Sequence, residues 1–235
     1  REVLGDSFIL KGNGLDIFSS NDWTMLQSAN LPNEIIFCAP VSKELPKVEG
    51  IIGNPLSPYA VTKFFVKQMA EVFNKTYGLK YIGLRYFNIF GPKQNPNNPY
   101  AAVIPIFCKH FIENTQLTIY GDGNTSRDFT FVENAVQANI LALLNGLTAS
   151  LSKHEVFNVA CGDQISLNEL VSLLIKVSGK NIDVLYGSSR KGDVKHSLAD
   201  IKKLQTYCNY DPKFSLDQGL TIVYEWYLKN YKIIN

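Results

Sequence analysis

Two β-prone runs separated by one long helix are the feature that most constrains how this chain can fold. Residues 34–39 read EIIFCA and residues 80–86 read KYIGLRY, and both are compact apolar runs of the kind found in buried parallel strands. Between them, a helix is expected over residues 58–77, with Gly78 as its stop. Strands that alternate with helices indicate an α/β fold with a parallel sheet.

The same alternation continues to the end of the chain. Helices are predicted over 102–113, 132–144, 167–177, 197–204 and 216–229, and strands over 117–120, 156–159 and 183–186. Before residue 34, only a short strand at 8–10 and a helical turn or two at 24–29 are expected. No internal repeat or low-complexity stretch interrupts the pattern.

Composition excludes several classes of function. The 235 residues carry a net charge of +2 and 23 scattered basic residues, so neither nucleic acid nor a membrane is expected as a partner. No signal peptide or long apolar run is visible, and we expect a cytoplasmic protein with reduced thiols. No metal site is expected, because the spacing of the cysteines and histidines does not suit one. These residues are Cys38, Cys108, Cys161, Cys208, His110, His154 and His196.

The predicted helix begins with Ser57 as N-cap and Pro58 at the first helical position. Tyr59 and Lys63 follow four residues apart and therefore share one face of the helix. A phenol, with a pKa of about 10, is a poor base at neutral pH. A neighbouring ammonium and a cationic cofactor favour the phenolate, which can then accept a proton from a sugar hydroxyl. Taken alone, Y-x-x-x-K fits an exposed helical pair better than a catalytic pair, so the surrounding motifs decide its interpretation.

The predicted helix is apolar on more than one side. One side is expected to pack on the sheet, while the other fits either a second subunit or a core position within a monomer. The apolar positions are Ala60, Val61, Phe64, Phe65, Val66, Met69, Ala70, Val72 and Phe73.

Four segments between Leu45 and Lys203 resemble the extended short-chain dehydrogenase/reductases that act on nucleotide sugars, and most closely the UDP-N-acetylglucosamine/UDP-glucose 4-epimerases. The segments are LPKVEGIIGNPLSPYAVTK (45–63), LRYFNIFGPKQNPNNPYAAVIP (84–105), YGDGNTSRDFTFVENAVQAN (120–139) and SSRKGDVKHSLADI (188–201). The resemblance implies a partial Rossmann-like, doubly wound sheet with a smaller C-terminal α/β part that binds substrate. It also implies NAD as cofactor, a homodimer, and a place in polysaccharide biosynthesis.

On this resemblance the chain has three parts. Residues 1–44 are a divergent remnant of the NAD-binding half, residues 45–95 end the Rossmann-like domain, and residues 96–235 mainly bind the nucleotide sugar. Tyr59 and Lys63 would be the catalytic pair, with Lys63 also holding the nicotinamide ribose.

The substrate residues are also implied by the resemblance. Asn88 would bond the sugar diphosphate, although it also fits a turn asparagine. Ala102 and Val103 belong to the segment that closes over the nucleotide, and Tyr120 would lie beside the uracil or simply end a strand.

Two arginines resemble the diphosphate clamp of the family. Guanidinium forks suit phosphate oxygens, so Arg127 and Arg190 would grip the diphosphate from distant segments, although each alone also fits a solvated surface position. Asp193 would accept from the uridine ribose hydroxyls. Asp128 is expected to orient Arg127 or to hold the turn.

The chain departs from the family in two places. A G-x-x-G-x-x-G loop after the first strand cradles the NAD pyrophosphate in the family, and nothing here matches it; 11–14 (KGNG) is expected to be a β-turn. A Ser/Thr-rich stretch after the strand at 35–39 is shortened, leaving Ser42 as its only stand-in. Since the chain also begins with Arg1, we expect the C-terminal two-thirds of an epimerase.

The predicted reaction is oxidation of the sugar at C4 and reversal through a 4-keto intermediate, with N-acetylglucosamine favoured over glucose. One alternative is a nucleotide-sugar 4,6-dehydratase, which would require an acidic pair near the shortened stretch. The other is a remnant without catalysis, either a UDP-sugar-binding pseudoenzyme or a fragment without function.

Overall fold

The computed structural model describes residues 34–37, 45–51, 58–97, 102–148, 154–189 and 194–234; side chains at 34–37, 58–60, 146–148, 154 and 231–234 are excepted. Within these residues no helix is long and apolar enough to cross a membrane. Some expectations lie outside the described residues. They concern the elements at 8–10 and 24–29, the turn at 11–14, Cys38, Ser42 and Ser57.

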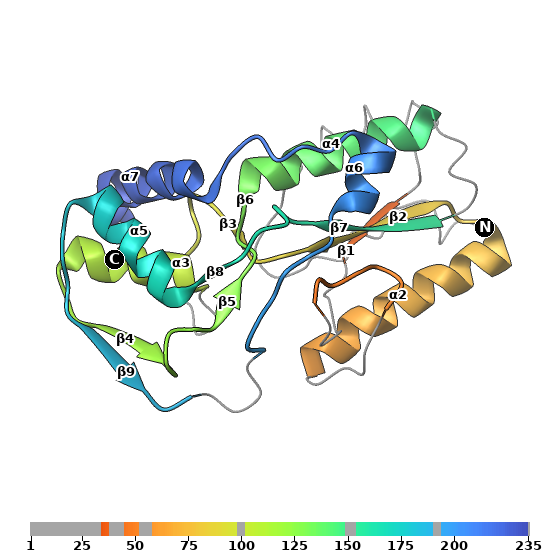
Figure 1. Ribbon diagram of the computed structural model, residues 1–235. Coiled ribbons are helices and arrows are strands. Elements are labelled where there is room, and N and C mark those ends of the chain that lie inside the picture. The colour runs from red at the N-terminus through yellow and green to blue at the C-terminus, as the bar shows by residue number, and fades with distance from the viewer. Residues whose placement is uncertain are drawn as a thin grey trace.

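The first half of the fold is a three-stranded parallel sheet with helices on both faces, which confirms the predicted β-α-β unit. Its strands run in the order β1–β2–β7, with α2 on one face and α4 and α6 on the other (Figure 1). These elements are β1 (Glu34–Phe37), α2 (Pro58–Tyr77), β2 (Tyr81–Tyr86), α4 (Val132–Thr148), β7 (His154–Val159) and α6 (Lys202–Cys208). The fold is therefore α/β and Rossmann-like, as predicted.

Alternation along β2 explains why both faces are covered. Tyr81 is buried against Val66 and Ala70 of α2, whereas Ile82 and Leu84 are buried in the cluster that contains the α4 alanines. Successive side chains of a strand point to opposite faces, so a strand that is buried at successive positions has cover on both sides.

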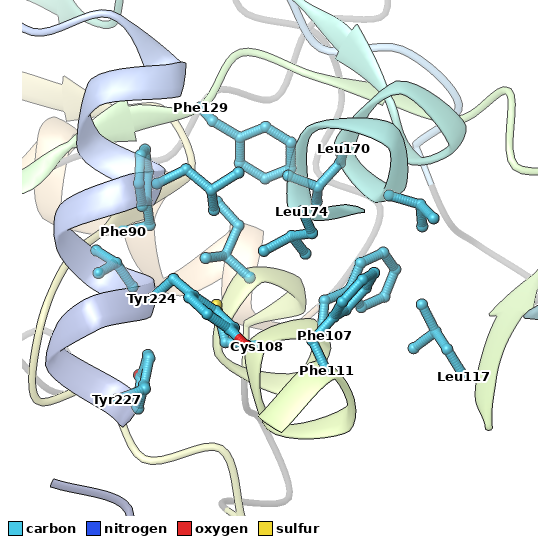
Figure 2. Packing of buried hydrophobic residues seen from close by; sticks show 14 of the residues in the cluster. Phe90, Phe107, Cys108, Phe111, Leu117, Phe129, Leu170, Leu174, Tyr224 and Tyr227 are labelled. Atoms are coloured by element: carbon cyan, nitrogen blue, oxygen red, sulfur yellow. The ribbon is translucent and has the colours of Figure 1, made fainter. Parts of the chain in front are cut away.

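The second half packs three helices around a separate core. Phe107 and Phe111 of α3 are four residues apart, as are Leu170 and Leu174 of α5, so each helix presents one apolar face to the Tyr224 side of α7 (Figure 2). Strands β4 and β9 form a parallel pair beside this core. The elements are α3 (Val103–Glu113), β4 (Leu117–Tyr120), α5 (Leu167–Ser178), β9 (Val184–Gly187) and α7 (Leu216–Ile234).

Four two-residue strands join the halves, and the sequence did not predict them. β3 pairs with β6 in parallel, and β5 pairs with β8 in antiparallel orientation. They are β3 (Ile89–Phe90), β5 (Ser126–Arg127), β6 (Thr130–Phe131) and β8 (Ile165–Ser166). Figure 1 places β5 between the β4–β9 pair and α2.

The helix predicted over 197–204 is wrong. The helix α6 begins only at Lys202, and the residues before it pair with distant backbone instead of forming a helical turn. Ser197 N–H donates to Ser126 O at 3.1 Å, and Leu198 O accepts from Lys47 N–H at 2.8 Å. Pairing with segments far away in the sequence has overridden a local helical pattern.

Candidate functional site

The N-terminal end of α2 lies at the carboxyl edge of the sheet. α2 ends at Tyr77 and β2 begins at Tyr81, so the helix runs antiparallel to the strands and starts beside their carboxyl ends (Figure 1). Gly78, with φ of 70° and its N–H on Asn74 O, ends the helix as predicted. Ligands of open α/β sheets bind outside the carboxyl ends of the strands.

Tyr59 and Lys63 both belong to the first turns of α2. The helix thus places this pair at the ligand-binding edge, with the Lys63 side chain half-buried. The side chain of Tyr59 is outside the described part of the structure. Proton transfer by the pair therefore remains a prediction.

Asn88, just after β2, contacts the backbone next to Arg127, although the two residues are far apart in the sequence. Asn88 has φ of 40°, and its Nδ2 donates to Asp128 O at 3.1 Å. Arg127 Nη1 donates to Ser126 O at 2.8 Å and to Lys195 O at 3.4 Å. The Asn88 amide thus lies against the residue that follows Arg127, and amide and guanidinium donors both suit phosphate oxygens.

Asp128 holds the turn, one of the two roles considered for it. Its carboxylate is fully buried and accepts the backbone N–H groups of Cys161, Gly162 and Ala199 at 3.0, 3.1 and 3.2 Å. Burial raises the pKa of this carboxyl to about 7, and the three N–H donors oppose that rise. The residue beside Arg127 thus fastens three segments of the chain together.

The residues predicted to bind the nucleotide belong to the second half of the fold, with Ala102 and Val103 at the start of α3 and Tyr120 at the end of β4. Ala102 is the N-cap of α3 and offers no capping side chain, so the first N–H groups of the helix that begins at Val103 have no side-chain acceptor at the cap. Tyr120 ends β4 with 48% of its surface exposed, and its ring packs on Gly187. An exposed aromatic ring at a strand end suits stacking on a flat base.

Arg190 and Asp193 lie outside the described residues, and their roles remain predictions. Among the residues that are described, no group of histidine, cysteine and acidic side chains is arranged to hold a metal. Cys108, Cys161 and Cys208 are free thiols, and burial raises the pKa of each, to about 12 for Cys108 and about 11 for the other two.

An open cavity of about 460 Å³ lies beside Arg127 and is also lined by residues 211–216, the segment that leads into α7. It does not include Asn88, Ala102, Val103 or Tyr120, so this cavity is not the predicted nucleotide site. Its lining is mixed in charge, with Asp163, Asp211 and Lys213 around an apolar floor.

Comparison with known proteins decides the family. A model of the NAD dependent epimerase/dehydratase family matches residues 37–160. The chain belongs to this family. The match includes the Tyr59–Lys63 pair, Asn88 and Arg127, so the resemblance drawn from sequence motifs is confirmed.

Relatives of this epimerase/dehydratase chain carry names from UDP-sugar chemistry. The UDP-N-acetylglucosamine 4-epimerase of Methanobrevibacter ruminantium, solved with UDP-N-acetylmuramic acid, is 36% identical to this chain and superposes with a TM-score of 0.74. The match covers 83% of this chain and 63% of the epimerase chain. The UDP-glucose 4-epimerase of Thermotoga maritima, solved with UDP-glucose, is 33% identical with a TM-score of 0.76, covering 84% and 63%. A UDP-glucuronate 4-epimerase of Thermodesulfobacterium geofontis is 32% identical over 78% of this chain.

The chain spans only 51–58% of the length of the first three curated relatives. Lys63, half-buried at the carboxyl edge, fits the nicotinamide ribose as a donor of hydrogen bonds. The pyrophosphate end is not matched, because the sequence contains no G-x-x-G-x-x-G loop.

The sequence motifs did not point to the residues whose hydrogen bonds join the chain segments around Arg127. Lys47, Ser126, Asn158 and His196 are buried or half-buried polar residues that tie the segments together. The only local signal was the polar run KHSLAD at 195–200, which follows the predicted substrate aspartate.

Proposed function

We propose that this chain binds a UDP-sugar and supplies the proton-transferring residues of an NAD-dependent UDP-sugar 4-epimerase. The observation that carries the proposal is the placement of Y-x-x-x-K at the carboxyl edge of a parallel sheet, in a member of the epimerase/dehydratase family. The contact of Asn88 with the backbone next to Arg127 supports the proposal that both residues bind a diphosphate.

In this proposal Tyr59 takes the proton from the sugar 4-hydroxyl and later returns it. Lys63, on the same helix face, favours the phenolate by its charge and hydrogen-bonds the ribose of the cofactor. Bound NAD would supply the acceptor, and then the donor, of the C4 hydride. Arg127 and Asn88 hold the diphosphate while the sugar turns.

The proposed sugar is N-acetylglucosamine. Similarity to the Methanobrevibacter UDP-N-acetylglucosamine 4-epimerase supports it, while other relatives act by name on UDP-glucose or UDP-glucuronate. The proposed setting is the cytoplasm, in keeping with the free state of the described cysteines.

A second copy of the chain is the proposed partner. α2 packs Val66 and Ala70 on the sheet and leaves an apolar stripe exposed on its outer side. The stripe consists of Val61, Phe65, Met69 and Val72. An exposed stripe at helical spacing supports a homodimer in which two such helices pack together.

A UDP-sugar-binding protein without turnover is the second candidate. It needs only the residues proposed to bind the diphosphate, Asn88 and Arg127, and not proton transfer by Tyr59. The two candidates share the diphosphate residues and differ only in whether NAD binds.

Titration with UDP and with NAD, followed by incubation with both NAD and UDP-N-acetylglucosamine, separates the candidates. The enzyme proposal expects binding of both ligands and a product with inverted 4-hydroxyl. UDP binding without NAD binding or product would leave the non-catalytic candidate, and failure to bind UDP would refute both.

A further inference from the structure

The segment 195–200 runs between β5 and residue Lys47 and pairs with both. Toward its start, Ser126 N–H donates to Lys195 O at 3.0 Å and Ser197 N–H donates to Ser126 O at 3.1 Å. Toward its end, Asp200 N–H donates to Lys47 O at 3.0 Å. The segment therefore behaves as a short extended strand whose register against β5 is set at Ser126.

A side-chain contact fixes that register. Ser126 is 7% exposed, and its Oγ lies 2.8 Å from His196 Nδ1 and 2.9 Å from Gln164 Oε1. The hydroxyl has one proton, which the Gln164 oxygen accepts, so His196 Nδ1–H must donate to Ser126 Oγ. Both the imidazolium and the neutral Nδ1–H tautomer carry that proton, so this bond does not depend on the charge of the ring.

The register decides how Arg127 is held. One guanidinium nitrogen, Nη1, donates to Ser126 O and Lys195 O, which belong to the two paired strands. The guanidinium is planar, so fixing one nitrogen on two carbonyls sets the direction of the whole fork. If the two strands separate or slip, the carbonyl pair is lost.

The positive charge of Lys47 lies near Arg127, so the two carbonyl bonds of the guanidinium offset a repulsion. Lys47 is 4% exposed, and burial together with the nearby Arg127 charge lowers the pKa of its ammonium. Two buried cations that repel each other are stabilised when carbonyl oxygens or an anion lie beside them.

We propose that His196 is a positioning residue for the nucleotide-sugar site: by its hydrogen bond to Ser126 it holds the two carbonyls that aim Arg127 at the diphosphate. The inference rests on the proposed function, since it requires UDP at Arg127. His196 does not touch the substrate; its effect passes through Arg127.

Two amide replacements test the atom involved. In His196→Asn the amide nitrogen takes the place of Nδ1, and in His196→Gln it takes the place of Nε2. We expect His196→Ala and His196→Gln to weaken UDP binding about five- to ten-fold, the loss of about one hydrogen bond, and His196→Asn to restore most of it. Isothermal titration with UDP measures this on the full chain.

A double-mutant cycle tests the route through Arg127. Arg127→Met removes the guanidinium, so adding His196→Ala in that background should weaken UDP binding no further. An undiminished effect of His196→Ala there, or equal behaviour of the Asn and Gln variants, would overturn the positioning role. If the unmodified chain binds no UDP, the proposed function fails and this inference with it; if it binds UDP as tightly as His196→Ala does, only the inference fails.

Discussion

Replacing Asn158 by alanine should destabilise the fold far more than an ordinary polar truncation. Asn158 lies near the end of β7 with no exposed surface, and its Nδ2 donates to Lys47 O at 2.7 Å and to Asp200 O at 3.0 Å. One amide thus joins β7 to two segments that pair with each other. Each buried bond contributes about 1 kcal/mol, and the loss of the Asn158 donor at the Asp200 carbonyl adds to this, whereas Lys47 O keeps the Asp200 N–H, so we expect a cost of about 2–4 kcal/mol.

Urea unfolding followed by fluorescence measures this cost. Asn230→Ala is the matched control, because within the described residues Asn230 Nδ2 bonds Trp226 O of its own helix α7. We expect a change of less than about 0.5 kcal/mol for the control, since alanine is the better helix former. A cost below about 1 kcal/mol for Asn158→Ala, or one equal to that of the control, would refute the role given to Asn158.

Three further predictions concern other parts of the fold. Gly123→Ala should cost more stability than Gly179→Ala, because both have positive φ (75° and 67°) but only at Gly123 would a Cβ collide with the Asn168 side chain; thermal unfolding compares them. The buried Asp128 has a raised pKa of about 7, so the native state binds its proton more tightly than the unfolded state does. The stability that this proton contributes is present below the unfolded pKa of about 4 and falls by up to about 1.4 kcal/mol per pH unit as the pH rises toward 7. Asp128→Asn should remove this slope in urea unfolding measured at several pH values. Phe65, 61% exposed on α2, should hold the dimer, so Phe65→Glu should sediment as a monomer, and a wild-type chain that is itself monomeric would contradict the proposed interface.

The parts of the fold that could be predicted are those with strong local signals. The helix α2 was bounded by Pro58 and Gly78, and both ends agree with the structure. The strand β4 and the helix α5 also lie where their patterns placed them, and α5 begins with a capping box between Ser166 and Glu169.

The short strands of the junction could not be predicted because their pairing is non-local. A two-residue strand carries no periodic pattern, and Ser126 finds its partners at Ser166 and His196. The extended segment before α6 was taken for helix for the same reason, since its partner Lys47 lies far away in the sequence.

The site was predictable only where a motif stands on one element. Y-x-x-x-K lies on a single helix, so its spacing alone brings Tyr59 and Lys63 onto one face. The contact between Asn88 and the backbone beside Arg127 depends on how two halves of the fold meet, and only the family resemblance pointed to it. The contribution of His196 had no counterpart in the motif analysis.

Tyr59 is proposed to transfer the proton of a UDP-sugar 4-hydroxyl. Its most direct test is proton NMR of UDP-N-acetylglucosamine incubated with NAD and either the unmodified chain or Tyr59→Phe, which removes only the phenolic oxygen. We predict accumulation of the sugar with the inverted 4-hydroxyl for the unmodified chain and a loss of at least about a hundred-fold in rate for Tyr59→Phe. Absence of product from the unmodified chain, or an equal rate from both, would contradict the account.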